Sequence, residues 1–292
     1  MKLFLNNKYI VENYSVNSEP VQLNEIDELL NELDDNISKE VKIPSDVLNS
    51  FRIKENLNPE LWDGDKLKSD VKKTLNKIAN DFFETLKLPK SVKILDILFT
   101  GSLANYNWSK YSDIDLHILI DFSKLNGNKD FVKNSFDSQK NMWNLKHDVT
   151  IHDYDVELYV QDIKEKLMAT AVYSIVNDEW LEKPERENIK INKKEIKQKA
   201  EFFIDKLNTI KKEYDDDNFK KCISDIDKLK EKLKNFRKSG LEKGGEYSIE
   251  NIVYKTLRRS DFLEIIDTYK AKSYDKLMSI KESIKNKLKT IV

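Results

Sequence analysis

Residue types that cross-link the backbone or bend it sharply are rare in this sequence. Its 292 residues include one cysteine, six glycines and five prolines. The single cysteine, Cys222, excludes an intramolecular disulfide and a zinc site built from several cysteines. The scarcity of glycine and proline argues against an all-β sandwich with many tight turns and against low-complexity sequence. Three histidines are too few for most histidine-rich metal sites.

Long apolar runs are also missing, and the formal net charge is only −1. No run approaches the roughly 18 apolar residues that span a bilayer. The first residues carry neither the apolar core nor the cleavage motif of a signal peptide. Basic and acidic residues number 51 and 52, so no global positive field is available to hold a nucleic acid. We therefore expect a cytoplasmic protein with no membrane partner; the oligomeric state stays open.

Charged residues make up 35% of the chain and hydrophobic residues 39%, which suits long solvated helices. The texture changes near residue 190, from mixed helix and strand patterns to Lys/Glu/Asp-rich helical patterns. The sequence therefore predicts an α+β domain over residues 1–190, with an N-terminal helical extension over about 1–90, and a helical domain over residues 191–292.

Hydrophobic periodicity predicts the elements of each half. In the first half we expect a short strand at 2–5, helices at 23–33 and 59–87 (the latter capped by Asp63 or Asp65), a strand at 92–100, a strand at 113–121, a helix at 130–145, a hairpin of 149–152 with 156–161, a helical stretch near 163–169 and a strand at 171–176. In the second half we expect helices at 192–210, 219–236, 249–259, 260–271 and 274–290, with a loop at 239–245.

A glycine-serine pair, Gly101-Ser102, follows the predicted strand at 92–100 and opens a short helical or looped segment. Glycine lets a backbone approach a phosphate closely, and the N–H groups at a helix start point toward an anion. The Ser102 hydroxyl adds a donor. The pair is therefore a candidate phosphate-binding turn.

Two aspartates, Asp113 and Asp115, stand two positions apart at the start of the strand at 113–121. Side chains alternate along a strand, so both project to one face, while Ile114 and Leu116 project to the other. Adjacent carboxylates repel each other unless a cation lies between them, and hard oxygen ligands suit Mg²⁺ or Mn²⁺. The pair predicts a divalent-metal site for phosphoryl transfer.

A third carboxylate is expected from the strand at 156–161. Glu157 lies within its apolar run and is favoured; Asp155 shares the same face and is the fallback. We expect this strand to lie beside residues 113–121 in an antiparallel pair, which would bring one of the two acids to the aspartates. That acid would complete the metal site and help to activate an attacking hydroxyl.

Gly101-Ser102, ten intervening residues, Asp113-x-Asp115 and a later acidic strand together resemble the nucleotidyltransferase superfamily related to DNA polymerase β. The resemblance covers roughly residues 92–161, and its surrounding residues resemble small bacterial and phage members. It implies a mixed sheet flanked by helices and followed by a helical domain. It further implies that the Gly-Ser pair holds the triphosphate and that the carboxylates bind two divalent metal ions.

Other residues are candidates for contacts with the nucleotide. Lys110 and Ser112 lie between the Gly-Ser pair and Asp113, and Tyr173 could stack on a base, although core packing is the commoner role for such a tyrosine. Lys255 shares a helix face with Arg258 and could clamp a triphosphate; alternatively, the arginine complements the helix dipole. His117, on the face of Asp115, could touch substrate or simply fill the sheet surface.

The expected function is Mg²⁺-dependent (or Mn²⁺-dependent) transfer of a nucleoside monophosphate from an NTP such as ATP to an acceptor hydroxyl, with release of pyrophosphate. The sequence does not identify the acceptor, which could be a small molecule, a protein or an RNA end. Two alternatives stay open: a non-catalytic protein that binds nucleotides or partners through the same fold, and a helical adaptor.

Overall fold

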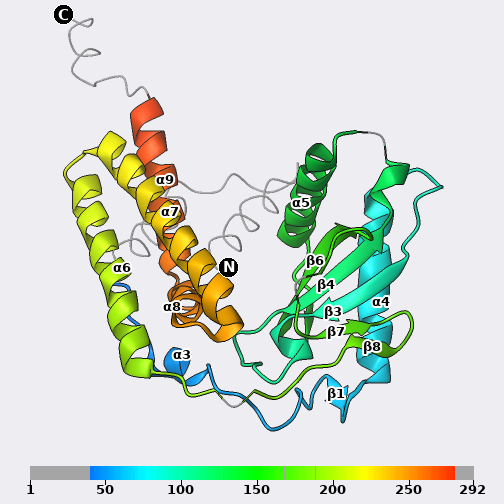
Figure 1. Ribbon diagram of the computed structural model, residues 1–292. Helices are drawn as coiled ribbons and strands as arrows, with labels where there is room; N and C mark the ends of the chain where they lie inside the picture. Colours follow the sequence, from blue (N-terminus) through cyan, green and yellow to red (C-terminus); the bar gives the residue numbers. More distant parts are fainter. Residues whose placement is uncertain (1–39, 126, 168, 188, 280–292) are drawn as a thin grey trace, which may run out of the picture. The chain divides into compact units, whose positions relative to one another are not determined.

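The computed structural model describes residues 40–125, 127–167, 169–187 and 189–279 (Figure 1). The expected strand at 2–5, the helix at 23–33 and most of the helix at 274–290 lie outside these residues. The described chain divides into two compact units. The sheet unit contains residues 50–189, and the helical unit contains residues 190–279 together with 40–49. Residues 40–49 therefore group with the helices, whereas the sequence-based domain division placed them with the sheet.

A six-stranded mixed sheet forms the centre of the sheet unit (Figure 1). Its strands, in spatial order, are β5 (Thr150–Ile151), β6 (Tyr154–Asp162), β4 (Ile114–Ile120), β3 (Asp96–Thr100), β7 (Val172–Ser174) and β8 (Glu179–Glu182). The pairs are antiparallel except β4 with β6, which is parallel. The expected mixed sheet with helices is confirmed at this level.

The parallel pairing of β4 with β6 corrects the antiparallel pairing expected from the sequence. Between these strands the chain runs through helix α5 (Lys129–Lys146) and the short strand β5. Such a helical crossover returns the chain to the same end of the sheet, so the next long strand runs in the same direction. The hairpin of β5 with β6 turns at His152 and Asp153, which both have positive φ, as a two-residue turn of type I′ requires.

The alternating pattern of β4 decides which residues form the core. Ile114, Leu116 and Ile118 are fully buried, whereas Asp115 and His117 between them are half-buried on the opposite face. The buried face packs with helices α4 (Ser69–Thr85) and α5 into the main core, to which α4 contributes Leu75 and Phe82 among other residues. The hydrophobic effect therefore fixes the register that turns Asp115 away from the core.

Helix α4 begins ten residues later than expected, because the preceding residues fold as a small hairpin. Strand β1 (Trp62–Asp63) pairs with β2 (Lys66–Leu67), and Gly64 between them has φ 61°. The buried Trp62 ring stacks on Trp180 at a centroid distance of 4.8 Å, and its N–H donates to the Leu103 carbonyl at 2.8 Å. Asp63 and Asp65 therefore do not cap the helix, whose N-cap is Lys68.

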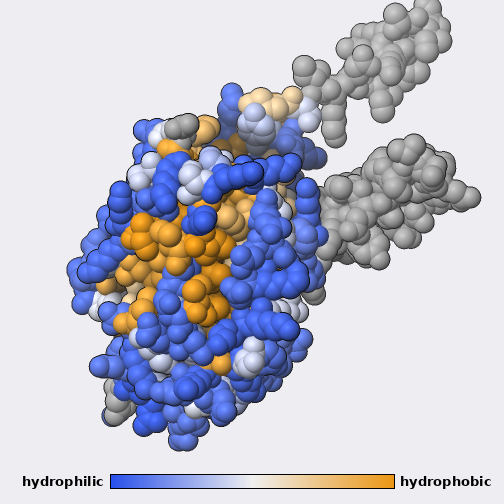
Figure 2. Space-filling model, turned by 90° about the vertical axis from the view of Figure 1, so that its right-hand side faces the viewer, coloured by the Kyte–Doolittle hydropathy of each residue, from blue (hydrophilic) through white to orange (hydrophobic). Residues whose placement is uncertain are grey.

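Apolar side chains also extend to the surface of the sheet unit. Figure 2 shows hydrophobic residues gathered in one area of the side that it draws. Leu98, Leu119 and Val172 form a small cluster separate from the main core. Several large apolar side chains of this unit are exposed, namely Leu95, Phe131, Met142, Ile163, Val176 and Leu181.

The stretch near 163–169, expected to be helical, is turn and coil over its described residues.

The helical unit contains α3 (Ser45–Asn49), α6 (Lys193–Asp215), α7 (Phe219–Gly244), α8 (Ile249–Arg258) and α9 (Phe262–Met278). The loop expected at 239–245 is wrong, because α7 continues to Gly244. A Cβ at Gly240 would lie 2.8 Å from Ser248 Oγ, so this glycine permits close packing at the start of α8. The two helices expected from 260 onward are one helix, α9. Cys222 is buried, in contact with Ser273.

None of the described helices is both long enough and apolar enough to cross a membrane.

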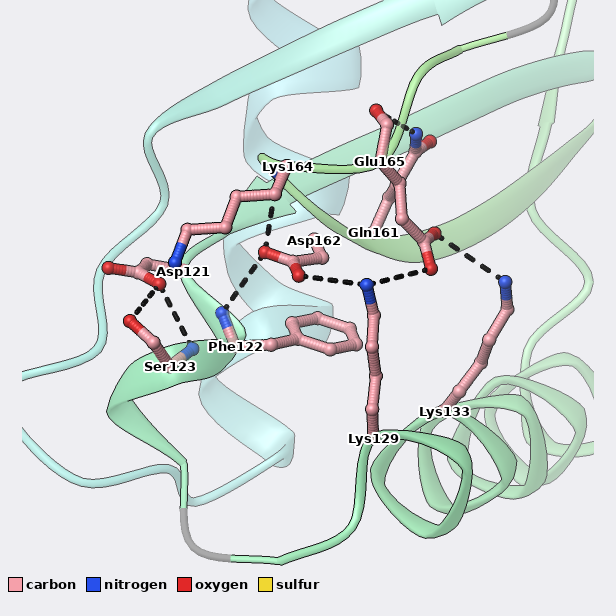
Figure 3. Close-up of polar contacts among 9 residues, drawn as sticks. All are labelled: Asp121, Phe122, Ser123, Lys129, Lys133, Gln161, Asp162, Lys164 and Glu165. Carbon is pink, nitrogen blue, oxygen red and sulfur yellow. Dashed lines mark hydrogen bonds and ion pairs between the residues drawn. The ribbon is translucent and has the colours of Figure 1, made fainter.

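A polar cluster fastens the carboxyl ends of β4 and β6 to the start of α5 (Figure 3). Asp162, at the end of β6, is only 4% exposed and accepts hydrogen bonds from the backbone N–H groups of Phe122 and Lys164. Lys129 Nζ lies 3.2 Å from Asp162 and 3.5 Å from Glu165. Burial raises the pKa of Asp162, but the hydrogen bonds from Lys129 and the two N–H groups outweigh it and hold this pKa below its usual value.

Replacing Asp162 by asparagine tests this cluster. We expect Asp162→Asn to lower the free energy of unfolding of the sheet unit by about 1–3 kcal/mol at pH 7, because a buried charge-assisted hydrogen-bond set is lost. All four tryptophans (62, 108, 143 and 180) lie in the sheet unit, so urea unfolding followed by tryptophan fluorescence reports on it.

The pH dependence has a definite sign. A carboxyl group whose pKa is lowered by folding stabilises the protein at pH values above its unfolded-state pKa, which is about 3.9 for Asp. This stabilisation is lost as the pH falls through the folded-state pKa. The difference between wild type and Asp162→Asn should therefore shrink in that acidic range. Asp121→Asn, which removes an exposed carboxylate bonded to Ser123, is the matched control and should cost less. Equal losses of unfolding free energy in Asp162→Asn and Asp121→Asn would contradict a stabilising role of the cluster.

Candidate functional site

The turn between β3 and β4 begins with a glycine in a conformation that other residues avoid. Gly101 has φ 79° and ψ −164°, and the short 3₁₀-helix η1 (Ser102–Ala104) follows. A side chain at this φ and ψ would strain the backbone, which accounts for glycine at this position. The Gly-Ser pair therefore leads from a strand end into a short helical segment, as the sequence predicts.

Gly101 is also required because Asp115 occupies the space beside it. Thr100 pairs with Asp115 in the antiparallel register of β3 and β4. A Cβ added to Gly101 would overlap Oδ2 of Asp115 and lie 2.9 Å from its Cγ. The carboxylate of Asp115 therefore rests directly on the turn, with no side chain between them.

Ser102 and Ser112 join the two ends of the connection between β3 and β4. The Ser102 hydroxyl donates to Ser112 Oγ at 2.7 Å, and Ser112 Oγ accepts from the Ser109 N–H at 3.0 Å. Ser112 is buried, whereas Lys110 is exposed, with its Nζ 5.0 Å from the centroid of the Tyr111 ring. Ser112 thus holds the loop closed immediately before Asp113, and Lys110 stands at its surface.

Glu157 lies beside Asp115 in the sheet. The parallel register of β4 and β6 pairs these two residues directly, so their side chains share the face opposite the core. Asp155 stands on the same face, next to β5, where it pairs with Thr150. The sheet therefore brings Glu157 closest to Asp115, and Asp155 flanks it.

The charges of these acids act on one another. Burial raises the pKa of Asp155, and the negative charges of Asp148, Asp113 and Glu157 raise it further. Burial likewise raises the pKa of the Tyr159 hydroxyl, together with the charge of Glu157, its hydrogen bond to Glu157, and the charges of Asp115 and Asp113. Such accumulated negative charge on one partly buried face is typical of a site that binds cations.

Behind Glu157 a row of side chains holds the carboxylate in place. The Tyr159 hydroxyl donates to Glu157 Oε2. His117 stacks on the Tyr159 ring at 4.8 Å, and its Nδ1 lies 2.9 Å from Gln161 Oε1. Lys140 Nζ of α5 lies 3.9 Å from the Tyr159 ring centroid. Tyr159 is thus fixed by contacts on its ring and on its hydroxyl.

His117 contacts Tyr159 and Gln161 in this row. Burial lowers its pKa, the hydrogen bond with Gln161 opposes this effect, and the charge of Lys140 lowers the pKa further. Gln161 in turn donates to the Glu165 carbonyl at 3.3 Å, which links the row to the cluster drawn in Figure 3. This placement agrees with the interpretation of His117 as a residue that fills the sheet face.

The donor chemistry of the site fits a hard divalent cation. Asp113, Asp115 and Glu157 supply carboxylate oxygens, the ligands that Mg²⁺ and Mn²⁺ prefer, and Gly101 leaves room beside one of them. Among the described residues, no three acidic, histidine or cysteine side chains already converge tightly enough to form a finished metal site. The register brings the strands together, and side-chain rotation would have to complete the coordination.

A pocket is lined by residues of β6, by the end of α5 and by two of the acids. Its volume is about 450 Å³. It is lined by residues of α4, of the end of α5, of the following loop and of β6, namely Ile78, Asn141, Trp143, Asn144, His147, Asp148, Val149, Asp155, Val156 and Glu157. Both candidates for the third carboxylate therefore line the pocket.

Of the other predicted nucleotide contacts, one is a core residue of the sheet unit and two belong to the helical unit. Tyr173 is 1% exposed, its ring packs in the core at 5.1 Å from Trp62, and its hydroxyl donates to Asp178, so core packing is its role here. Lys255 and Arg258 lie in the last turn of α8, in the helical unit. Lys255 Nζ forms an ion pair with Glu246 at 2.7 Å.

Tyr159, Lys140 and the pocket were not predicted from the sequence. Tyr159 follows Glu157 by two positions, so the strand period would have placed the two side chains together. Lys140 and Trp143 come from a helix whose side contacts are set by tertiary packing, and no local pattern marks them.

The close approach of Gly101 to Asp115 predicts an unusually costly substitution. We expect Gly101→Ala to lower the free energy of unfolding by about 2–4 kcal/mol, since backbone strain and overlap with Asp115 add. Gly64→Ala is the matched control, because Gly64 also has positive φ but has no atom near the added Cβ. It should show only the strain, about 1–2 kcal/mol. Equal urea midpoints for Gly101→Ala and Gly64→Ala, measured by tryptophan fluorescence, would show that Asp115 moves away from the added methyl group without a free-energy cost.

No protein-family model, no curated protein and no solved structure matches the chain. What characterises the chain is therefore the arrangement itself: a glycine-serine turn in contact with Asp115, and Glu157 beside that aspartate in the sheet.

Proposed function

We propose that this protein is a metal-dependent nucleotidyltransferase, which transfers a nucleoside monophosphate from an NTP to an acceptor hydroxyl and releases pyrophosphate. The observation that carries the proposal is the contact of Gly101 with Asp115 together with the register pairing of Asp115 with Glu157. A phosphate-binding turn and acids suited to divalent cations thereby adjoin each other, as phosphoryl transfer requires.

Each residue of the site has a task in this proposal. The backbone N–H groups after Gly101 bind the β- and γ-phosphates, and the Ser102 hydroxyl joins them when it turns from Ser112 to the phosphate. Asp113, Asp115 and Glu157 would hold Mg²⁺ or Mn²⁺, with Asp155 as the alternative to Glu157. The bound cation would neutralise charge on the triphosphate and the leaving pyrophosphate. The protein itself orients the reactants, so catalysis depends mainly on positioning.

The negative charges at Asp115 and Glu157 should be essential for activity, and removing them should leave the fold intact. We expect Asp113→Asn, Asp115→Asn and Glu157→Gln each to reduce pyrophosphate release from labelled NTPs with Mg²⁺ by about 100-fold or more, because ligand carboxylates are lost. If Glu157 is the third ligand, Asp155→Asn should reduce pyrophosphate release less than Glu157→Gln does. If Asp155 is the third ligand, Asp155→Asn should have the larger effect. The acceptor is supplied as separate pools of small molecules, proteins and RNA.

The outcomes separate the alternatives. If the wild type binds NTP but releases no pyrophosphate with any acceptor pool, the protein is a nucleotide-binding protein and not an enzyme. If it binds no NTP, the nucleotide site itself is wrong. Unchanged unfolding curves for the variants establish that any lost activity arises from the site.

Tyr159 should affect metal binding indirectly, by orienting the carboxylate of Glu157. We expect Tyr159→Phe to weaken binding of Mn²⁺ by about tenfold, because a hydrogen bond that orients a ligand carboxylate typically contributes 10- to 100-fold in metal affinity. Titration followed by electron paramagnetic resonance measures this without turnover. His117→Gln, in the same row but without a bond to a carboxylate, is the control and should change the affinity less. An unchanged affinity in Tyr159→Phe would contradict this role.

A further inference from the structure

A cavity lies in the helical unit between α6 and α7, which run side by side (Figure 1). Its volume is about 320 Å³, within the usual range for small-molecule sites. Two buried apolar residues, Ile210 and Leu229, line it together with charged side chains from both helices. All of its lining residues belong to the helical unit, so it is separate from the acidic face of the sheet unit.

Two lysines of the cavity are neutralised by acids that also line it. Lys221 Nζ lies 3.5 Å from Asp225 and also bonds to Glu213, and Lys228 Nζ lies 2.8 Å from Asp225. These two lysines and two acids balance in formal charge. A ligand in the cavity would therefore be attracted mainly by the positive charge of its other residues.

The other two lysines of the cavity, Lys206 and Lys232, have no acidic partner in the described part of the chain. Both lie beside one aromatic ring, that of Phe202, which is 43% exposed. Lys206 Nζ is 5.8 Å from the ring centroid, and Lys232 Nζ reaches the same ring from α7 at 4.4 Å. Like charges held beside one ring repel each other, and an anion with two negative charges would relieve that repulsion.

Glu213 adds a buried hydrogen-bond acceptor that lacks a donor. Its residue is only 7% exposed, and its Oε1 accepts from Lys221. Its Oε2 is buried without a hydrogen-bond partner among the described residues. Such an acceptor costs about 1–3 kcal/mol of desolvation free energy. Because Glu213 lines the cavity, a ligand placed there could supply the missing O–H or N–H donor.

We propose that this cavity binds a small molecule that carries a phosphate group together with a hydroxyl or amine donor. The phosphate lies between Lys206 and Lys232, whose ammonium groups form charge-assisted hydrogen bonds with its oxygens. The donor of the same molecule bonds to Glu213. This site does not depend on the proposed NTP site of the sheet unit, so the failure of one leaves the other standing.

The charges of the cavity favour such a ligand over a nucleic acid backbone. A backbone presents a row of phosphates, and those beyond the first would meet the carboxylates of Glu213 and Asp225. A single phosphate needs only the two lysines without acidic partners. A sugar hydroxyl or an amine on the same molecule can then face the carboxylate.

Three probes separate the two parts of the ligand: glucose 6-phosphate, inorganic phosphate and glucose. Each is titrated into the full chain at constant ionic strength, without NTP or metal, and the δ1-methyl signal of Ile210 is followed by nuclear magnetic resonance. An Ile210→Val variant assigns this signal. We expect glucose 6-phosphate to shift it at several-fold lower concentration than phosphate, because only the ester also carries sugar hydroxyls. Glucose should not shift it.

Single charge removals then locate the phosphate. Lys206→Gln and Lys232→Gln should each weaken binding of glucose 6-phosphate about two- to fivefold, the range of one accessible ion pair. Lys234→Gln is the matched control, because Lys234 is exposed on α7 but does not line the cavity, and it should leave binding unchanged. Glu213→Gln should bring the affinities for the ester and for phosphate closer together, because it weakens the bond to the hydroxyl and removes a charge that opposes phosphate.

Each other outcome overturns the proposal in a distinct way. An Ile210 signal that does not respond to glucose 6-phosphate shows that the cavity is not the site. Equal affinities of the wild type for the ester and for phosphate contradict the donor bond to Glu213 and with it the ligand class. Equal weakening in Lys234→Gln indicates general surface charge. A short single-stranded RNA that shifts the signal at lower concentration than glucose 6-phosphate identifies a nucleic acid surface instead.

Discussion

The missing side chain at Gly101 is the constraint on which the rest of the site depends. Any Cβ there would occupy the position of the Asp115 carboxylate, so the turn and the acid can adjoin only if residue 101 is glycine. Its positive φ directs the chain from β3 into η1. The pairing of Thr100 with Asp115 and of Asp115 with Glu157 then places a second acid one strand further along.

Concentrating Asp115, Asp155 and Glu157 on one sheet face, with Asp113 directly before β4, is unfavourable by itself, and the surrounding structure compensates for it. The opposite faces of β4 and β6 are buried in the main core, which fixes both registers. Lys129 fastens the ends of these strands to α5 through Asp162 (Figure 3). From there Gln161, His117 and Tyr159 connect to Glu157. The acids are thus held by packing and hydrogen bonds, and a bound cation would relieve their repulsion.

Helix α5 has two consequences for function. As the crossover between β4 and β6 it makes these strands parallel, and this direction allows Asp115 and Glu157 to be neighbours in register. Its last turns form a wall of the pocket with Trp143 and His147, while Lys140 contacts the ring of Tyr159. One connecting helix therefore contacts the tyrosine that binds the proposed third ligand and forms one wall of the pocket beside that ligand.

The local pattern of the chain was sufficient to predict the strands that carry the site and the face of each side chain, because alternation with period two is a property of the strand itself. It also located the turn at Gly101-Ser102. The direction of β6, the continuity of α7 through Gly240, the hairpin ahead of α4 and the burial of Tyr173 were decided only by tertiary structure. Strand direction follows from how a crossover packs, the glycine within α7 from the close approach of Gly240 to Glu250 and Ser248, and burial from the aromatic neighbours that Trp62 and Trp180 supply. Contacts between residues far apart in the chain leave no periodic trace in the sequence, so these features were visible only in the folded chain.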